Sequence, residues 1–159
     1  MNKTELIQRI IDQLAYDLDI LFSAAKTAHE AATHAENAPD NKYDTLALEA
    51  SYVAQGQANR AQDIRKSIEI YKQLPSQAGA DDTIRLTSLV TLSAADGVVK
   101  LVFMGPVEGG LKIEHEGAEI VVITPGSPMF RELLGKSIGD AVEIEAGTNR
   151  TEYEIVEVC

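Results

Sequence analysis

The chain has 159 residues, 45% of them hydrophobic, and its 25 acidic side chains outnumber 14 lysines and arginines, giving a formal net charge of −11. This composition suits one or two small folded domains and excludes a disordered chain. The acidic balance, with basic residues scattered among acids, argues against binding to free nucleic acid. It fits a protein that approaches a basic protein surface, or one that is simply soluble.

The cysteine content and the N-terminus indicate the compartment. The single cysteine, Cys159, excludes an internal disulfide, and a terminal thiol is a poor candidate nucleophile. Residues 1–14 mix acidic and polar residues into their apolar pattern, unlike a signal peptide. No run of about 18 apolar residues occurs, so we expect no membrane span and a cytoplasmic protein.

Residues 1–38 predict one long helix. Apolar residues recur at alternating gaps of four and three with no glycine or proline between them, which is the period of a coiled-coil seam. The seam consists of Ile7, Ile11, Leu14, Leu18, Leu21, Ala25, Ala28, Ala32 and Ala35. Pro39 ends the helix, because the residue before a proline avoids the helical region.

A second helix is predicted from the tip to Pro75, with a seam that weakens at Gln57 beside Gly56 and then recovers. The connection is short, so the two helices should lie antiparallel. Alanines fill the half of the seam near the turn, which makes that half thin and poor in buried apolar area. We therefore predict a hairpin over residues 1–75, with an acidic tip near 36–45, shaped to enter a narrow space.

Residues 76–82 predict a linker, and residues 83–159 a small α+β domain. Strand patterns occur at 83–93, 97–105, 110–124, 140–147 and 151–158, and we expect them to form an antiparallel sheet. Between them, residues 127–135 predict one short helix. Ser127 is its expected cap, Pro128 takes the first helical position and Gly135 ends it.

The C-terminal part resembles the C-terminal domain of the bacterial Gre transcript-cleavage factors. The shared skeleton is Ser127-Pro128, Leu133-Leu134-Gly135-Lys136, Gly139-Asp140, Val142-Glu143-Ile144 and Tyr153-Glu154-Ile155-Val156-Glu157. Each piece is common, but the order and spacing together are specific. Residues 47–64, anchored on Gln55-Gly56, resemble the start of the second Gre helix. The resemblance implies a coiled-coil hairpin followed by an FKBP-like domain.

The resemblance also implies a function. In the Gre family the hairpin enters the secondary channel of RNA polymerase core, and acidic tip residues help to hold the catalytic Mg²⁺ and a water. The polymerase then cleaves its own backtracked RNA. The chain is accordingly expected to be an accessory factor and not an enzyme. It would hold no tightly bound cofactor, contact nascent RNA only indirectly, and be a monomer.

The tip residues can be aligned without gaps from Gln55-Gly56. Asp44 then falls on the second of the family's two tip acids and Asn41 on the first. Asp40 takes the first acid's place if the turn shifts by one residue, so Asp44 and Asp40 are the candidate metal ligands. Under the alternative interpretation these residues are solvated charges that cap the second helix and favour its dipole.

The family's C-terminal domain docks at the channel rim, and the candidate docking residues here are Ser127, Pro128, Phe130 and Arg131. Two other functions remain open: a Gre-fold regulator that occupies the channel without cleavage, and a stand-alone protein-interaction module. Prolyl isomerase activity is disfavoured, because the chain has no tryptophan to line such a pocket. His115 has no ligand-like partner in the sequence.

Overall fold

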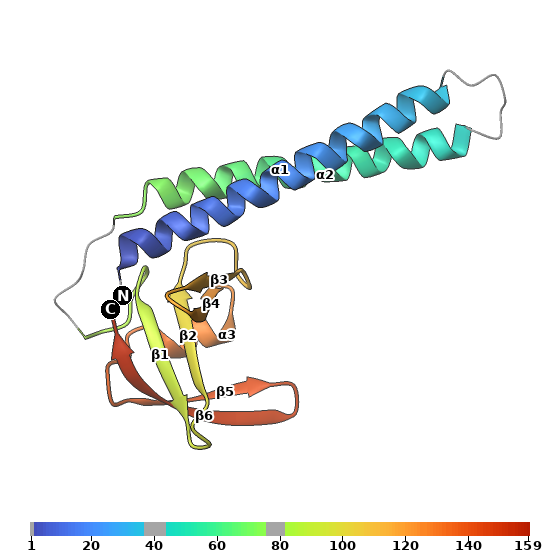
Figure 1. The fold of residues 1–159 in the computed structure, drawn as a ribbon. Coiled ribbons are helices and arrows are strands. Elements are labelled where there is room, and N and C mark those ends of the chain that lie inside the picture. Colours follow the sequence, from blue (N-terminus) through green and yellow to red (C-terminus); the bar gives the residue numbers. More distant parts are fainter. Residues whose placement is uncertain (1, 37–43, 76–81) are drawn as a thin grey trace. The chain divides into compact units, whose positions relative to one another are not determined.

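A computed structural model describes residues 2–36, 44–75 and 82–159 (Figure 1). The elements are α1 (Lys3–Glu36), α2 (Asp44–Lys72), β1 (Leu89–Ala94), β2 (Val99–Met104), β3 (Lys112–His115), β4 (Ala118–Ile123), α3 (Pro128–Leu133), β5 (Ala141–Ala146) and β6 (Asn149–Val158). The predicted fold class, a helical hairpin followed by a small sheet domain with one helix, is confirmed. Within these described residues, neither long helix has a stretch apolar enough to cross a membrane.

Contacts divide the chain into two compact units. One consists of residues 11–69, and the other of residues 1–10 together with 70–159. This division differs from the ranges expected from the sequence, which kept the whole hairpin apart from the sheet domain. The difference arises because the open ends of both helices bury large side chains, Leu6 and Tyr71, within the unit that contains the sheet.

In the unit of residues 11–69, α1 and α2 lie side by side and run in opposite directions (Figure 1). The predicted seam is buried at Leu14, Ala61 and Ile64. Beyond Leu14, none of the α1 side chains that the structure describes is fully buried. The alanine half of the predicted seam, at Ala25, Ala28, Ala32 and Ala35, lies at side chains that the structure does not describe, so its thinness stays a prediction. A Cβ at Gly56 would meet no atom within 4 Å, so close helix packing does not require this glycine.

The sheet has six strands in the order β3-β4-β2-β1-β6-β5. Its neighbours pair antiparallel except for β2 and β4, which run parallel. The sheet is thus mixed, where the sequence predicted an antiparallel one. The chain leaves β2, crosses through residues 105–111 to the edge strand β3, and returns as β4 between β3 and β2. A strand that returns in this way must run parallel to β2.

The first strand is shorter than its alternating pattern predicts. The pattern covers residues 83–93, but β1 begins only at Leu89. Thr87 has a positive φ of 74°, a conformation that side-chain-bearing residues rarely adopt and that interrupts an extended chain. Its amide donates a hydrogen bond of 2.7 Å to the carbonyl of Met104. The first part of this alternating apolar–polar pattern is therefore a turn that leads into β1, and only the last part is a strand.

Helix α3 lies against one face of the sheet (Figure 1). Phe130 and Leu133 join the sheet's main core, with side chains from β1, β2, β4, β5 and β6. Pro128 is the first helical residue, and Gly135 follows the helix with φ of 82°, as predicted. Leu133 is fully buried, whereas its neighbour Leu134 is 50% exposed.

Tyr71 connects the end of α2 to the loop that follows β2. Its side chain is fully buried, and its hydroxyl donates a hydrogen bond of 2.6 Å to the carbonyl of Val107. A Cβ at Gly105 would lie 2.6 Å from the Tyr71 hydroxyl and 2.7 Å from Cγ1 of Val122. Position 105 therefore requires glycine, because any side chain would displace the tyrosine or Val122.

We predict that Gly105→Ala lowers the free energy of unfolding by about 1–3 kcal/mol, since the added methyl overpacks this junction. Gly126→Ala is the matched control: a Cβ there meets no atom within 4 Å, and Gly126 has no positive φ. Urea denaturation of both variants measures the difference. Equal stability of Gly105→Ala and wild type would contradict the packing argument.

Burial, and secondly the negative charge of Glu108, raise the pKa of Tyr71 well above its ordinary value of 10. The folded state keeps the phenol neutral at a pH where the unfolded state ionises it. This contribution to stability is complete below pH 10 and is lost as the pH rises through the folded pKa.

We therefore predict that the free energy of unfolding falls above pH 10, and that Tyr71→Phe removes this part of the decline. At neutral pH the same substitution should cost about 1 kcal/mol through the lost hydrogen bond. Denaturation at a series of pH values, with Tyr16→Phe at an exposed position as the control, tests both effects. An unchanged alkaline slope in Tyr71→Phe would refute the assignment.

Candidate functional site

The predicted hairpin tip falls mostly outside the described residues. Helix α1 ends at Glu36 and α2 begins at Asp44, so Asp44 is the first residue of α2. Asp40 and Asn41 lie outside the described part of the chain. The assignment of Asp44 and Asp40 as metal ligands, with Asn41 at the first acid position, therefore stays a prediction.

Of the four candidate docking residues of the sheet domain, three lie at least partly on the surface and one, Phe130, lies in the core. Ser127 is extended, with φ of −84° and ψ of 136°, and its side chain makes no capping hydrogen bond. Pro128 is exposed, and the exposed Arg131 donates a hydrogen bond of 3.2 Å to the carbonyl of Gly126. Phe130 is only 4% exposed. We correct the assignment of Phe130, since its ring packs into the core and offers no docking surface.

Two exposed apolar residues near α3 were missed by the sequence analysis. Leu134 is 50% exposed and Ile138 is 44% exposed. The Leu133-Leu134 pair gave no indication of which leucine packs inward, because the helix ends there. The turn over Ser137–Asp140, in which the Ser137 amide donates to the Asp140 carboxylate at 2.8 Å, holds Ile138 on the surface.

A hollow between α3 and β5 has an acidic lining. Its residues are Pro128, Met129, Glu132, Glu143, Ile144 and Glu145. Arg150 lies near two of these carboxylates, at 2.7 Å from Glu145 and 3.8 Å from Glu143. All three side chains are more than half exposed, so these ion pairs contribute little to stability. Glu143 and Glu145 alternate with the core-packed Ile144 along β5, so Glu132 is the residue that contributes a carboxylate from the α3 side of the hollow.

A second hollow lies beside β2, β3 and β4 and is mainly apolar. It is lined by Val99, Lys100, Leu101, Val102, Lys112, Ala118, Glu119, Val121, Ile123 and Met129. None of these ten residues is aromatic, whereas the interpretation as a prolyl isomerase requires an aromatic pocket. This hollow therefore gives no support to isomerase activity.

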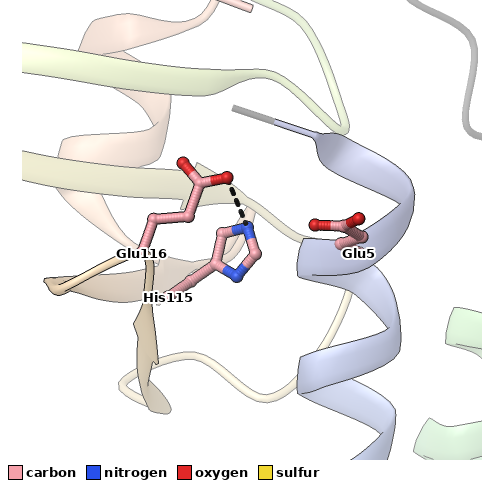
Figure 2. Close-up of side chains that lie close together, drawn as sticks. All are labelled: Glu5, His115 and Glu116. Carbon is pink, nitrogen blue, oxygen red and sulfur yellow. Dashed lines mark ion pairs between the residues drawn. The ribbon is translucent and has the colours of Figure 1, made fainter.

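His115 is the third feature, and its surroundings were not evident from the sequence. The residue is 4% exposed, and neither ring nitrogen has a hydrogen-bond partner in the described structure. Glu116 places a carboxylate oxygen 3.8 Å from Nε2 of His115, and Glu5 of α1 completes the group (Figure 2). Glu116 is adjacent in the chain, but nothing in the pattern pointed to Glu5, which is far away in sequence.

Lys3, the first residue of α1, is buried and lies beside the C-terminal residue, Cys159. Lys3 donates a hydrogen bond of 3.3 Å from Nζ to the carbonyl of Cys159, and burial, then nearby Arg85, lowers the pKa of this lysine. Burial and the neighbouring Glu157 raise the pKa of the Cys159 thiol. A thiol held protonated in this way is a weak nucleophile, which agrees with the expectation that Cys159 is not catalytic.

Comparison with known proteins identifies the class. Residues 79–159 match the family model described as "Transcription elongation factor, GreA/GreB, C-term". The match covers more than half of the chain. The chain therefore belongs to the GreA/GreB family of transcription elongation factors, as its C-terminal motifs predicted.

Individual relatives extend the similarity across the hairpin. The chain is 27% identical to the transcription elongation factor GreA of Mesorhizobium japonicum, over 81% of this chain and 76% of that one. It is 25% identical to the transcription elongation factor GreA of Xanthomonas campestris, over 96% and 92%. Among solved structures, GreA factor homolog 1 of Thermus thermophilus is 21% identical over 94% of each chain, with a TM-score of 0.41.

Proposed function

We propose that this protein binds RNA polymerase core, enters its secondary channel with the α1–α2 hairpin, and stimulates cleavage of backtracked RNA. The observation that carries the proposal is the family match over residues 79–159 in a chain that also has a long two-helix hairpin. On this proposal the protein is an accessory factor that acts in the cytoplasm with the polymerase.

The dimensions of the hairpin support this proposal. Helix α1 has 34 residues, which at a rise of 1.5 Å each gives a length of about 50 Å. Its described side chains beyond Leu14 are not fully buried, so the rod is only two helices thick there. A long and thin rod of this kind is able to carry a few side chains deep into a narrow opening.

The tip chemistry supports a role in hydrolysis. Mg²⁺ in polymerase sites is bound by one or two carboxylates together with waters. A divalent ion at such a site activates water and stabilises the charge that develops on phosphate. Asp44, with Asp40 if the turn is shifted, would supply a carboxylate to the polymerase's own centre. The protein itself then needs no resident metal for this role.

The acidic hollow between α3 and β5 is the proposed docking surface at the channel rim. Glu132 contributes a carboxylate from α3, and Glu143 and Glu145 lie on β5 at the other side of the hollow. The net charge of −11 favours approach to a basic protein surface. Leu134 and Ile138 add exposed apolar area to the same segment of the domain. Arg131 and Ser127 remain docking candidates on α3, whereas Phe130 does not.

A second candidate function has a specific observation in its favour. The ungapped alignment places Asn41, which carries no charge, where the family has its first tip acid. A factor without that acid would occupy the channel and regulate the polymerase without stimulating cleavage. A stand-alone interaction module is the third possibility, and co-purification with core polymerase distinguishes it from the other two.

A transcript-cleavage assay on a stalled elongation complex tests the tip. We predict that Asp44→Asn lowers cleavage by about tenfold or more while leaving polymerase affinity nearly unchanged, because the substitution keeps size and removes charge. Asn41→Asp should raise cleavage, since it restores an acid at the first position. Both effects should depend on the Mg²⁺ concentration.

The outcomes separate the candidate functions. If Asp44→Asn cleaves as well as wild type, the tip acids do not act on metal. If no variant cleaves but all bind, the channel-occupying regulator replaces the cleavage factor. If the full-length protein does not bind core polymerase even at low salt, both polymerase proposals are refuted.

The docking surface has a separate test. We predict that Glu132→Lys weakens binding to core polymerase by about tenfold at low salt, because it reverses a charge in the acidic hollow, and that the loss shrinks at high salt. Glu114→Lys makes the same charge change at an exposed position on β3 and should bind like wild type. Equal affinities of the two variants would exclude the α3–β5 hollow as the docking site.

A further inference from the structure

His115 is a buried polar side chain whose ring nitrogens have no hydrogen-bond partner among the described residues. It is 4% exposed. Buried polar groups in native proteins are almost always partnered, because desolvation of an unpaired nitrogen is costly. The position of this imidazole is set by packing at the end of β3, with a carboxylate on either side. A histidine held in this way has the arrangement of a ligand.

Two carboxylates face the imidazole from different elements. Figure 2 shows the His115 ring between Glu116, in the turn after β3, and Glu5, in the first turn of α1. The nearest oxygen of Glu116 is 3.8 Å from Nε2, which is too long for a hydrogen bond. One ligand atom from each of the three residues lies within 4.8 Å of the others. All three belong to the same compact unit.

The turn that carries Glu116 is an unusual place for glutamate. Glu116 has φ of 52° and Gly117 has φ of 79°, so both central residues of this two-residue hairpin turn are left-handed. Asn, Asp and Gly are the residues that such turns favour. Glutamate at this position has the longer side chain, which brings its carboxylate beside Nε2 of His115.

One imidazole and two carboxylates form a donor set for a first-row divalent metal. Zn²⁺ is bound by histidine nitrogen and carboxylate oxygen at about 2.0–2.2 Å, which brings tetrahedral ligands to roughly 3.3–3.6 Å from one another. Glu5 is exposed and the Glu116 side chain is 51% exposed, so both can rotate inward by this small amount. Mg²⁺ and Ca²⁺ are disfavoured, because they prefer oxygen ligands alone.

We propose that Glu5, His115 and Glu116 form a binding site for Zn²⁺ or a similar late first-row metal, with a fourth position open to water. Its two carboxylates balance the charge of the ion, while the imidazole remains neutral. The ion would join the start of α1 to the β3–β4 turn within one compact unit. This site is independent of the hairpin tip and of the proposed action on RNA polymerase.

The test begins by removing the other nitrogen and sulfur ligands. The chain has three histidines and one cysteine. In the triple variant His29→Gln, His34→Gln, Cys159→Ser, His115 is the only remaining histidine and no cysteine is left. Calorimetric titration of this variant with zinc chloride should show one equivalent bound. In the same background, His115→Gln should lower affinity by about 100-fold, and Glu5→Gln or Glu116→Gln by about tenfold each.

Glu114→Gln is the matched control, because Glu114 neighbours His115 on β3 but lies outside the cluster. It should bind zinc like the triple variant. Zinc at 100 times the Kd should also raise the melting temperature by about 5–10 °C, and this shift should vanish in Glu5→Gln. Glu5 is exposed, so its variant tests the site even if His115→Gln fails to fold.

Two results would overturn the proposal. One is the absence of stoichiometric zinc binding by a folded triple variant. The other is zinc binding that survives both His115→Gln and Glu5→Gln. Cobalt substitution provides a second readout, since four-coordinate Co²⁺ with this donor set should give visible absorption that is lost in His115→Gln. Failure of this test leaves the polymerase proposal untouched.

Discussion

Tyr71 holds the last turn of α2 against the loop that follows β2, and the unit containing the sheet depends on this contact. Its ring is fully buried and its hydroxyl meets the Val107 carbonyl at 2.6 Å. Gly105 is required beside it, because even one methyl group would reach the hydroxyl and Val122. The last turn of α2 is thereby part of the packing of the unit that contains the sheet.

The hairpin itself has the opposite character. None of the α1 side chains described beyond Leu14 is fully buried, so these described residues contribute less buried area than the open end does. The proposed function explains why this described part of the hairpin buries so little apolar area. A rod that must fit a narrow channel cannot be thickened by a larger core. At the open end, by contrast, both helices bury large side chains, Leu6 and Tyr71, in the unit that contains the sheet.

The sheet domain presents two distinct kinds of chemistry. Between α3 and β5, a hollow lined by three glutamates and three apolar residues suits a weak and salt-dependent contact with a basic protein. At the end of β3, a buried imidazole lies between carboxylates from α1 and the following turn, which suits a coordinated ion. The α3–β5 hollow can act only if a partner protein reaches it. The proposed metal site, in contrast, requires a histidine that is buried away from water.

The sequence by itself determined the features that arise from local physics. Helix periodicity, the turn chemistry of Pro128 and Gly135, and the order of the C-terminal strands are all encoded within short windows, and the structure confirms them. The ordered motifs of residues 124–158 were also sufficient for the family. The tip residues Asp40 and Asn41 stay predictions, since they lie outside the described residues.

Only the tertiary structure decided the features that depend on distant partners. The parallel pairing of β2 with β4 follows from where β3 lies, which no local pattern states. Phe130 turned inward and Leu134 outward because α3 ends between Leu133 and Gly135, so one face alone meets the sheet. Glu5 and His115 are far apart in sequence, and their meeting reflects the packing of α1 within the sheet's own unit. Sequence patterns report which face of an element is buried, whereas the partner that buries it is set by the whole chain.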